Sequence, residues 1–245
     1  MRPILIVGAL VSETDYIISK IENVKESDLV GYKFYEGFIN DYPVALIKTE
    51  VGLVNAAMSV TLAIEKCNPA LIINEGTAGG ITENYHMRDI IIGKETFNIM
   101  ACMTPYKELG EGSNSLEWDY KSFFEGGNHR KVIYEGNEEL INFVYALKDE
   151  YKKGNVYIGR VGSGDVWNRE KDRLKYYADV HNVDCEDMEA VAIYSVANKF
   201  DIPVLGIKIM SDNELLGETY MPEVASDLQE FVYLVISEAA NFLKD

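Results

Sequence analysis

The sequence predicts an α/β fold with a mixed sheet. Short apolar runs, typical of strands buried on both faces of a sheet, alternate along the chain with amphipathic segments typical of helices. Near the N-terminus, two extended segments follow each other across Asn40-Asp41 and predict an antiparallel hairpin. Since no repeat, linker or low-complexity tract interrupts the chain, we expect residues 1–245 to form a single domain.

In the first half of the chain, a continuous apolar run at 4–10 predicts a buried strand. Ser12 is placed to cap a helix that presents Ile17, Ile18 and Ile21 on one face. The hairpin strands are expected at 32–39 and 44–51, a helix at 54–67 and a buried strand at 71–73.

In the second half, strands and helices continue to alternate, but the polar and aromatic segment 103–130 fits neither pattern. Extended structure is expected at 89–93, 94–100, 156–161 and 203–210. Helices are expected at 137–150, 169–178, 188–200 and 221–243.

The composition excludes several classes of protein. The chain of 245 residues is 47% hydrophobic and 26% charged, which suits a packed core, and its net charge of −17 disfavours nucleic-acid binding. Three widely spaced cysteines favour a reduced, cytoplasmic setting over a disulfide framework. The three histidines lack zinc spacing, and no apolar run is long enough for a membrane span. We therefore expect no metal, no membrane and no nucleic-acid partner.

Three acidic residues follow strand-like runs in three separate segments: Glu13, Glu189 and Asp212. In an open α/β sheet, ligands bind outside the carboxyl ends of the strands, so these carboxylates are candidates for one shared site. Each also has a plainer interpretation, because acids commonly start helices and occupy turns. Lys208 lies among apolar residues and needs a buried partner, for which Glu189 or Asp212 would serve.

Two further segments carry small or aromatic residues. Gly76-Thr77-Ala78-Gly79-Gly80 is either a loop that lets a ligand approach the backbone or a plain tight turn. Trp167 lies four residues past Ser163 in a Gly/Asp loop, which favours a stacking surface over a core position. A dinucleotide site is disfavoured, because Gly8 is followed by Leu10 and Glu13 rather than by further glycines.

The order of these motifs along the chain identifies a protein family more specifically than any single motif does. Gly-Ala-x-x-x-Glu, Gly-Thr-Ala-Gly-Gly, Ser-Gly-Asp, Met-Glu-Ala and Ser-Asp occur in this order over nearly the whole chain. The pattern resembles the nucleoside phosphorylase/nucleosidase superfamily, and within it the 5′-methylthioadenosine/S-adenosylhomocysteine nucleosidases. The resemblance implies a three-layer α/β/α fold around a mixed, twisted sheet, and a homodimer.

The resemblance also implies roles for the acids in cleaving the bond between adenine N9 and ribose C1′. Asp212 matches the general acid at N7, Glu189 the carboxylate that binds the ribose hydroxyls, and Glu13 the base that activates water. Thr77 stands where the family usually has Ser beside that water, and Trp167 replaces a Phe that stacks on the purine.

Further substrate contacts are implied at Leu10, Val51, Gly79, Met188, Ser211 and Asn168. Of these, Met188 packs against the sugar, while Leu10 and Val51 belong to the 5′-substituent pocket. Asn168 stands where an aliphatic residue normally lies beside the purine edge, which is read largely by backbone groups, so the preferred base stays open. The insertion 111–130, inside the poorly matching segment 101–131, is either a cover for the 5′ pocket or a surface or dimer-contact loop.

The nucleophile is expected to be water rather than phosphate. Phosphorylase relatives hold phosphate with arginines, where this chain has Asn74 and Val11-Ser12-Glu13. The expected activity is thus cofactor-independent hydrolysis of 5′-methylthioadenosine or S-adenosylhomocysteine. The alternatives are a purine nucleoside phosphorylase, a hydrolase of another purine nucleoside, and a non-catalytic nucleoside-binding protein.

Overall fold

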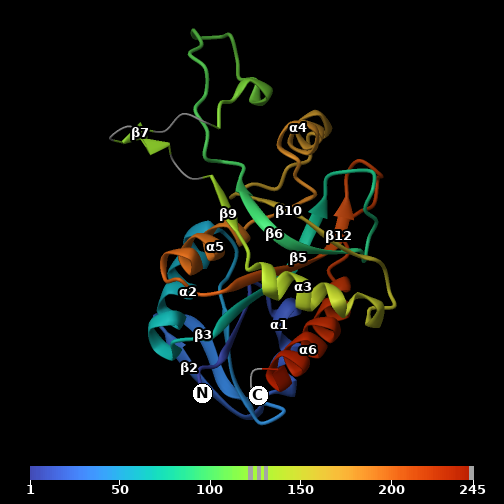
Figure 1. Cartoon of the computed structure of the whole chain (residues 1–245). Helices are drawn as coiled ribbons and strands as arrows, with labels where there is room; N and C mark the ends of the chain where they lie inside the picture. Colours follow the sequence, from blue (N-terminus) through green and yellow to red (C-terminus); the bar gives the residue numbers. More distant parts are fainter. Residues whose placement is uncertain (121–123, 126–127, 130–131, 243–245) are drawn as a thin grey trace.

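A ten-stranded mixed sheet runs through the centre of the molecule in the computed structural model, which describes residues 1–120, 124–125, 128–129 and 132–242 (Figure 1). The strands of this sheet are β1 (Ile4–Gly8), β2 (Glu22–Leu29), β3 (Tyr32–Ile39), β4 (Tyr42–Lys48), β5 (Leu71–Gly80), β6 (Ile90–Asn98), β9 (Ile133–Glu135), β10 (Val156–Ser163), β11 (Cys185–Asp187) and β12 (Val204–Asn213). Their order is β11-β10-β6-β12-β5-β1-β4-β3-β2, with β9 paired to β6. β7 (Phe124–Glu125) and β8 (Asn128–His129) form a separate pair.

Helices cover both faces of the sheet, so the expected three-layer arrangement and mixed sheet are confirmed (Figure 1). The helices are α1 (Val11–Lys20), α2 (Leu53–Cys67), α3 (Glu138–Ala146), α4 (Lys171–His181), α5 (Ala190–Lys199) and α6 (Val224–Phe242), with short 3-10 turns η1 (Ser115–Glu117) and η2 (Lys148–Glu150). α1, α3 and α6 share one core with the sheet, and α2 and α5 share the other.

The apolar sequence of β1 is explained by its position between two cores. Ile4 and Ile6 of β1 belong to the core beneath α1 and α6, whereas Leu5 and Val7 belong to the core beneath α2 and α5. Successive side chains of a strand point to opposite faces, so a strand covered on both sides needs apolar residues at every position.

Five strands of the sheet close into a ring. β11 pairs with both β10 and β5, and the path from β10 through β6 and β12 returns to β5. The prediction of a loop at Gly76–Gly80 was wrong, because this segment continues β5 and pairs with β12 and β11. Small residues are needed here: a Cβ on Gly79 would lie 3.3 Å from Asp212 Oδ2.

Several boundaries differ from those predicted from the pattern. β2, with the polar sequence ENVKESDL, was not expected; it extends the hairpin at the edge of the sheet and is mostly exposed. Leu10, not Ser12, is the N-cap of α1. β12 runs on to Asn213 through a register shift between Met210 and Asp212, which places Asp212 inside the strand rather than after it.

The unassigned segment after β6 extends away from the sheet at the end near α4 (Figure 1). Met103 pairs with Asp119, and the Arg173 guanidinium of α4 lies 4.6 Å from the centre of the Trp118 ring. Within the predicted insertion 111–130, residues 121–123, 126–127 and 130 lie outside the described residues, as does Leu243 of the predicted last helix.

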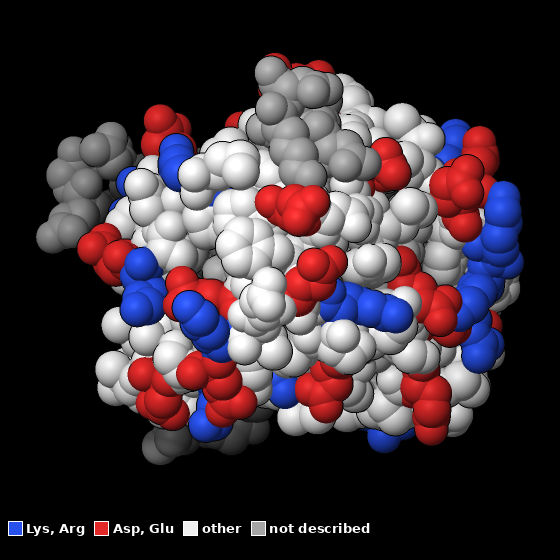
Figure 2. Space-filling model, turned by 90° about the horizontal axis from the view of Figure 1, so that it is seen from below, with Lys and Arg blue, Asp and Glu red and all other residues white. Residues whose placement is uncertain are grey.

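In the part of the chain that the structure describes, no helix is long and apolar enough to cross a membrane. On the face seen in Figure 2, basic and acidic side chains are interspersed. Several of the basic side chains are paired, for example Lys153 with Asp227 and Glu230.

Candidate active site

A cavity of about 220 Å³ opens at the carboxyl ends of β1, β5 and β12, beside the start of α5. Ligands of α/β sheets bind at this edge. The three predicted acids, Glu13, Glu189 and Asp212, all line the cavity. Seven of the other predicted contact residues also line it: Leu10, Val51, Thr77, Gly79, Trp167, Met188 and Ser211.

The Glu13 carboxylate is held by four hydrogen bonds. Its Oε1 accepts from the backbone N–H and the hydroxyl of Thr77, at 2.8 and 2.9 Å. Its Oε2 accepts from the N–H groups of Leu10 and Ala9, at 2.9 and 3.1 Å, at the open end of α1. Since these donors come from both β5 and the β1–α1 turn, they fix the buried carboxylate in one orientation at the cavity wall.

Glu189 is the N-cap residue of α5, because this helix begins at Ala190, two residues later than predicted. Its φ of −135° is outside the helical range, as expected of an N-cap residue, and Glu189 lines the cavity. The Oε1 atom accepts the Gly52 N–H at 2.9 Å. Burial, followed by the charge of the neighbouring Asp187, raises the pKa of Glu189 to about 7.

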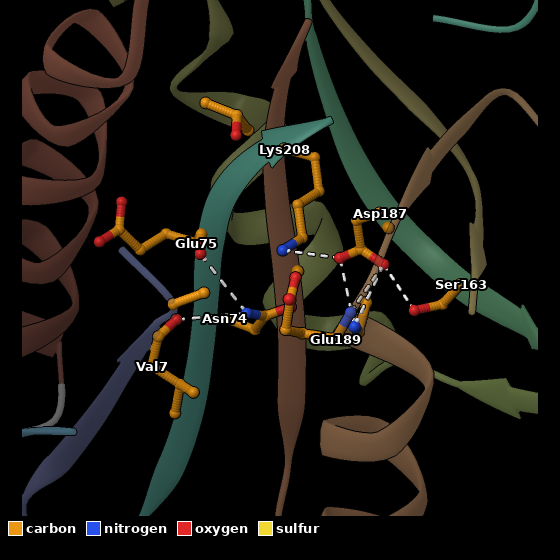
Figure 3. A network of polar contacts seen from close by, with 12 residues as sticks. Val7, Asn74, Glu75, Ser163, Asp187, Glu189 and Lys208 are labelled. Carbon is orange, nitrogen blue, oxygen red and sulfur yellow. Dashed lines mark hydrogen bonds and ion pairs between the residues drawn. The ribbon is translucent and has the colours of Figure 1, made fainter. Parts of the chain in front are cut away.

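Asp187 organises the polar network behind Glu189 (Figure 3). Its Oδ2 lies 2.9 Å from Lys208 Nζ, while Oδ1 accepts from Ser163 Oγ at 2.5 Å and from the Glu189 N–H at 3.3 Å. The expectation that Lys208 pairs with Glu189 or Asp212 was therefore wrong. Burial lowers the pKa of Lys208, but the Asp187 and Glu189 charges outweigh it and leave the pKa raised.

Asp212 lines the cavity from the end of β12. Its Oδ1 accepts a hydrogen bond from the Ser211 hydroxyl at 2.8 Å. Burial raises the pKa of Asp212, and the nearby Glu214 adds to this, while Ser211 and Arg169 oppose it. A carboxyl whose neutral form is favoured in this way is suited to donate a proton.

Two aromatic rings flank the cavity mouth. Trp167 is 56% exposed and meets Tyr220 edge to face, with ring centroids 5.4 Å apart. Both side chains line the cavity, and an exposed ring at this place is suited to stack on a planar ligand. Tyr220 was not predicted, because it lies between β12 and α6 in a stretch without any periodic pattern.

Asn168 is the one predicted contact residue that does not line the cavity. It is buried, and its side chain donates from Nδ2 to Glu186 Oε2 at 2.7 Å. Its backbone N–H donates to Glu186 Oε1 at 3.1 Å. Glu186 itself lines the cavity and was not predicted, although its place in the acidic run Glu186-Asp187 was a usable signal.

A further buried acid lies on β5 next to the catalytic candidates. The Glu75 carboxyl points away from Lys208 (Figure 3), and neither of its oxygens has a hydrogen-bond partner among the described residues. Burial raises the pKa of Glu75 well above its ordinary value. The Glu13 charge raises this pKa further, and the Lys208 charge lowers it by less. The neutral form of Glu75 is therefore favoured more strongly than in an exposed glutamate.

Among the described residues, the lining of the cavity is acidic. Five acids line it, and none of its described lining residues is Lys, Arg or His. The described residues also contain no group of three or more His, Cys, Asp or Glu side chains that could hold a metal ion. This arrangement suits a neutral or cationic ligand and carboxyl groups that exchange protons with it.

Comparison with known proteins shows the family of the chain. The model of the phosphorylase superfamily matches residues 3–245. A 5′-methylthioadenosine/S-adenosylhomocysteine nucleosidase of Staphylococcus haemolyticus is 31% identical over 239 residues, 94% of this chain and 97% of the relative. The nucleosidase of the same name from Haemophilus ducreyi is 29% identical over 240 residues, 95% of this chain and 96% of the relative.

Among solved structures, the Neisseria meningitidis nucleosidase of that name, in complex with methylthio-immucillin-A, superimposes with a TM-score of 0.80. The sequence identity is 20%, and the alignment covers 97% of this chain and 100% of the other. At this identity the match establishes the common fold.

Proposed function

From the membership of this chain in the phosphorylase superfamily, we propose that it is a hydrolase that cleaves the N-glycosidic bond of purine nucleosides carrying a 5′-thio substituent. The first substrates to consider are 5′-methylthioadenosine and S-adenosylhomocysteine, which the names of the relatives contain. The products are the free base and a 5′-thio-substituted ribose.

One observation carries the choice of water over phosphate as nucleophile. The Glu13 carboxylate, held by four donors, lies at the cavity wall, and no lysine, arginine or histidine is among the described lining residues. Phosphate sites normally offer arginine or lysine side chains, and a fixed carboxylate repels the anion. A water molecule, by contrast, can donate a hydrogen bond to Glu13 and lose its proton to it.

The proposed reaction uses three carboxyl groups. Asp212 donates a proton to N7 of the base as the bond between N9 and C1′ breaks. Glu189 accepts hydrogen bonds from the ribose hydroxyls and offsets the positive charge that develops on the ribosyl group. Water then adds to C1′ and gives its proton to Glu13. Asp212 ends ionised and Glu13 protonated, and exchange with solvent restores both.

We further propose that the protein is a homodimer. Met103, Tyr106 and Leu109 are exposed apolar side chains on the segment after β6, and Val51 and Trp167 are exposed at the cavity. A second copy that covered this segment would remove apolar surface from water. Light scattering on the unaltered protein and on Tyr106→Asp tests this. We expect the mass of two chains for the unaltered protein and of one chain for the variant. The mass of a single chain for the unaltered protein would contradict the proposal.

The activity is tested by incubating the protein with 5′-methylthioadenosine, with and without phosphate, and separating the products. We expect free adenine and methylthioribose at a rate that phosphate does not change. A phosphate-dependent sugar phosphate would overturn the assignment of Glu13. Glu13→Gln is expected to lose about 10²–10⁴-fold in kcat, whereas Glu65→Gln, an exposed change on α2, is the matched control.

A further inference from the structure

Glu186 adds a carboxylate residue to the lining of the cavity. Both of its carboxylate oxygens accept from Asn168, one from the backbone N–H and one from the side-chain amide. The backbone N–H of Asn168 therefore donates its hydrogen bond to Glu186. Glu186 is among the residues that line the cavity, whereas Asn168 is not.

The sheet register fixes where this acceptor lies relative to Asp212. Gly79 of β5 pairs with Glu186 on one side and with Asp212 on the other. Neighbouring strands lie about 4.8 Å apart, so the backbones of Glu186 and Asp212, one strand to each side of Gly79, are roughly 10 Å apart. Gly79 places no side chain between the two acids, and the Asp212 carboxyl lies close above it, 3.3 Å from where a Cβ would be; both acids line the same cavity.

A planar purine between these two groups would meet a different carboxyl at each end. If Asp212 contacts N7 on the five-membered ring, Glu186 is left to meet the six-membered ring and its N1 edge. Adenine has a bare acceptor at N1, whereas a 6-oxopurine such as hypoxanthine has an N1–H donor. An ionised carboxylate is an acceptor only, so it complements the N1–H and opposes the lone pair of adenine N1.

We propose that Glu186, held by Asn168, selects the base, so that this enzyme cleaves 6-oxopurine nucleosides such as 5′-methylthioinosine in preference to their adenine counterparts. This inference rests on the proposed hydrolase function and makes its substrate class more specific. A site built to bond an N–H of its substrate discriminates strongly against an analogue that lacks it, because its own polar group is then left unpaired.

The comparison of bases is best made at pH 8. Burial raises the pKa of Glu186 to about 7, and the Asp212 charge adds to this increase. The hydrogen bonds from Asn168 and the charge of Arg173 lower the same pKa by less. At pH 8 the ionised form therefore predominates.

The test is the ratio of kcat/KM for 5′-methylthioinosine to that for 5′-methylthioadenosine. We expect a ratio above 1 for the unaltered protein. The double variant Glu186→Val/Asn168→Ile removes both members of the pair together and leaves neither unpaired, and it should lower the ratio at least tenfold. A ratio at or below 1 in the unaltered protein, or an unchanged ratio in the variant, overturns the proposal. Glu65→Gln serves as the control.

Calorimetric binding of free hypoxanthine and free adenine separates this proposal from the hydrolase assignment. If neither nucleoside is cleaved, the hydrolase proposal fails, but tighter binding of hypoxanthine that depends on Glu186 still supports base selection. If adenine is released rapidly and binds more tightly than hypoxanthine, the hydrolase stands and the base selection fails. Should the double variant not fold, Glu186→Gln, which keeps the size of the side chain, replaces it in both measurements.

Discussion

The amine of Lys208 lies 2.9 Å from the carboxylate of Asp187, and these side chains are only 2% and 1% exposed. Removing one member of a buried ion pair leaves the other charge without compensation, which typically costs 3–5 kcal/mol. We expect Lys208→Met to lower the free energy of unfolding by about this amount, measured by urea denaturation. Lys208→Met/Asp187→Asn, which removes both charges, should recover part of the loss; equal losses in both variants would contradict the pairing.

Asp212→Asn tests proton delivery. The amide keeps the shape of the side chain but has no acidic proton to give, so kcat should fall about 10²–10⁴-fold. Binding of the free base, measured by calorimetry, should change far less, because the stacking surface at Trp167 is untouched. Retention of most turnover would exclude Asp212 as the general acid.

Ser211→Ala tests the role of Asp212 through its pKa. The Ser211 hydroxyl donates to Asp212 Oδ1 and so lowers the Asp212 pKa, against the larger effect of burial. Removing the hydroxyl is expected to raise that pKa further. The acid form then persists to higher pH, so the alkaline limb of the kcat profile should move upward. A shift to lower pH, or none, would mean that this limb reports another group.

Glu189→Gln separates sugar binding from protonation. Burial and Asp187 raise the pKa of Glu189 to about 7, so its ionised form is lost as the pH falls through that value. Since the ribose hydroxyls need an acceptor, KM for the nucleoside should rise below pH 7. In Glu189→Gln we expect a high KM at every pH and a lower kcat. A KM that still depends on pH in this variant would point to a different residue.

The elements with strong apolar periodicity could be predicted from the sequence, and those that depend on partners could not. β1 and α2 were found because their own residues form a buried pattern. β2 was missed because it is polar and becomes a strand only by pairing with β3. Gly76–Gly80 was interpreted as a loop because its glycines disfavour strands locally, yet pairing on both sides keeps the segment extended.

The candidate site shows the same division. Glu13, Glu189 and Asp212 come at or just after the carboxyl ends of apolar runs, so their convergence could be predicted from the sequence pattern, although Asp212 proves to lie within the end of β12. The partner of Lys208 could not, because Asp187 and Glu189 are two residues apart and the sequence does not tell which carboxylate points inward. Glu186 was overlooked for a related reason: its burial depends on β11, a strand of only three residues.

Glu75 is expected to reduce stability as the pH rises. Burial and the Glu13 charge raise its pKa in the folded protein well above the ordinary value of about 4.5, which applies to the unfolded chain. The folded state therefore holds a proton that the unfolded state releases above about pH 4.5, so the free energy of unfolding falls as the pH increases from there. Glu75→Gln, which imitates the neutral acid, should match the unaltered protein near pH 4.5 and exceed it in stability at pH 8. Urea denaturation at both values measures this, with Glu65→Gln as the exposed control. A variant less stable than the unaltered protein at pH 8 would mean that Glu75 is ionised and compensated inside the fold.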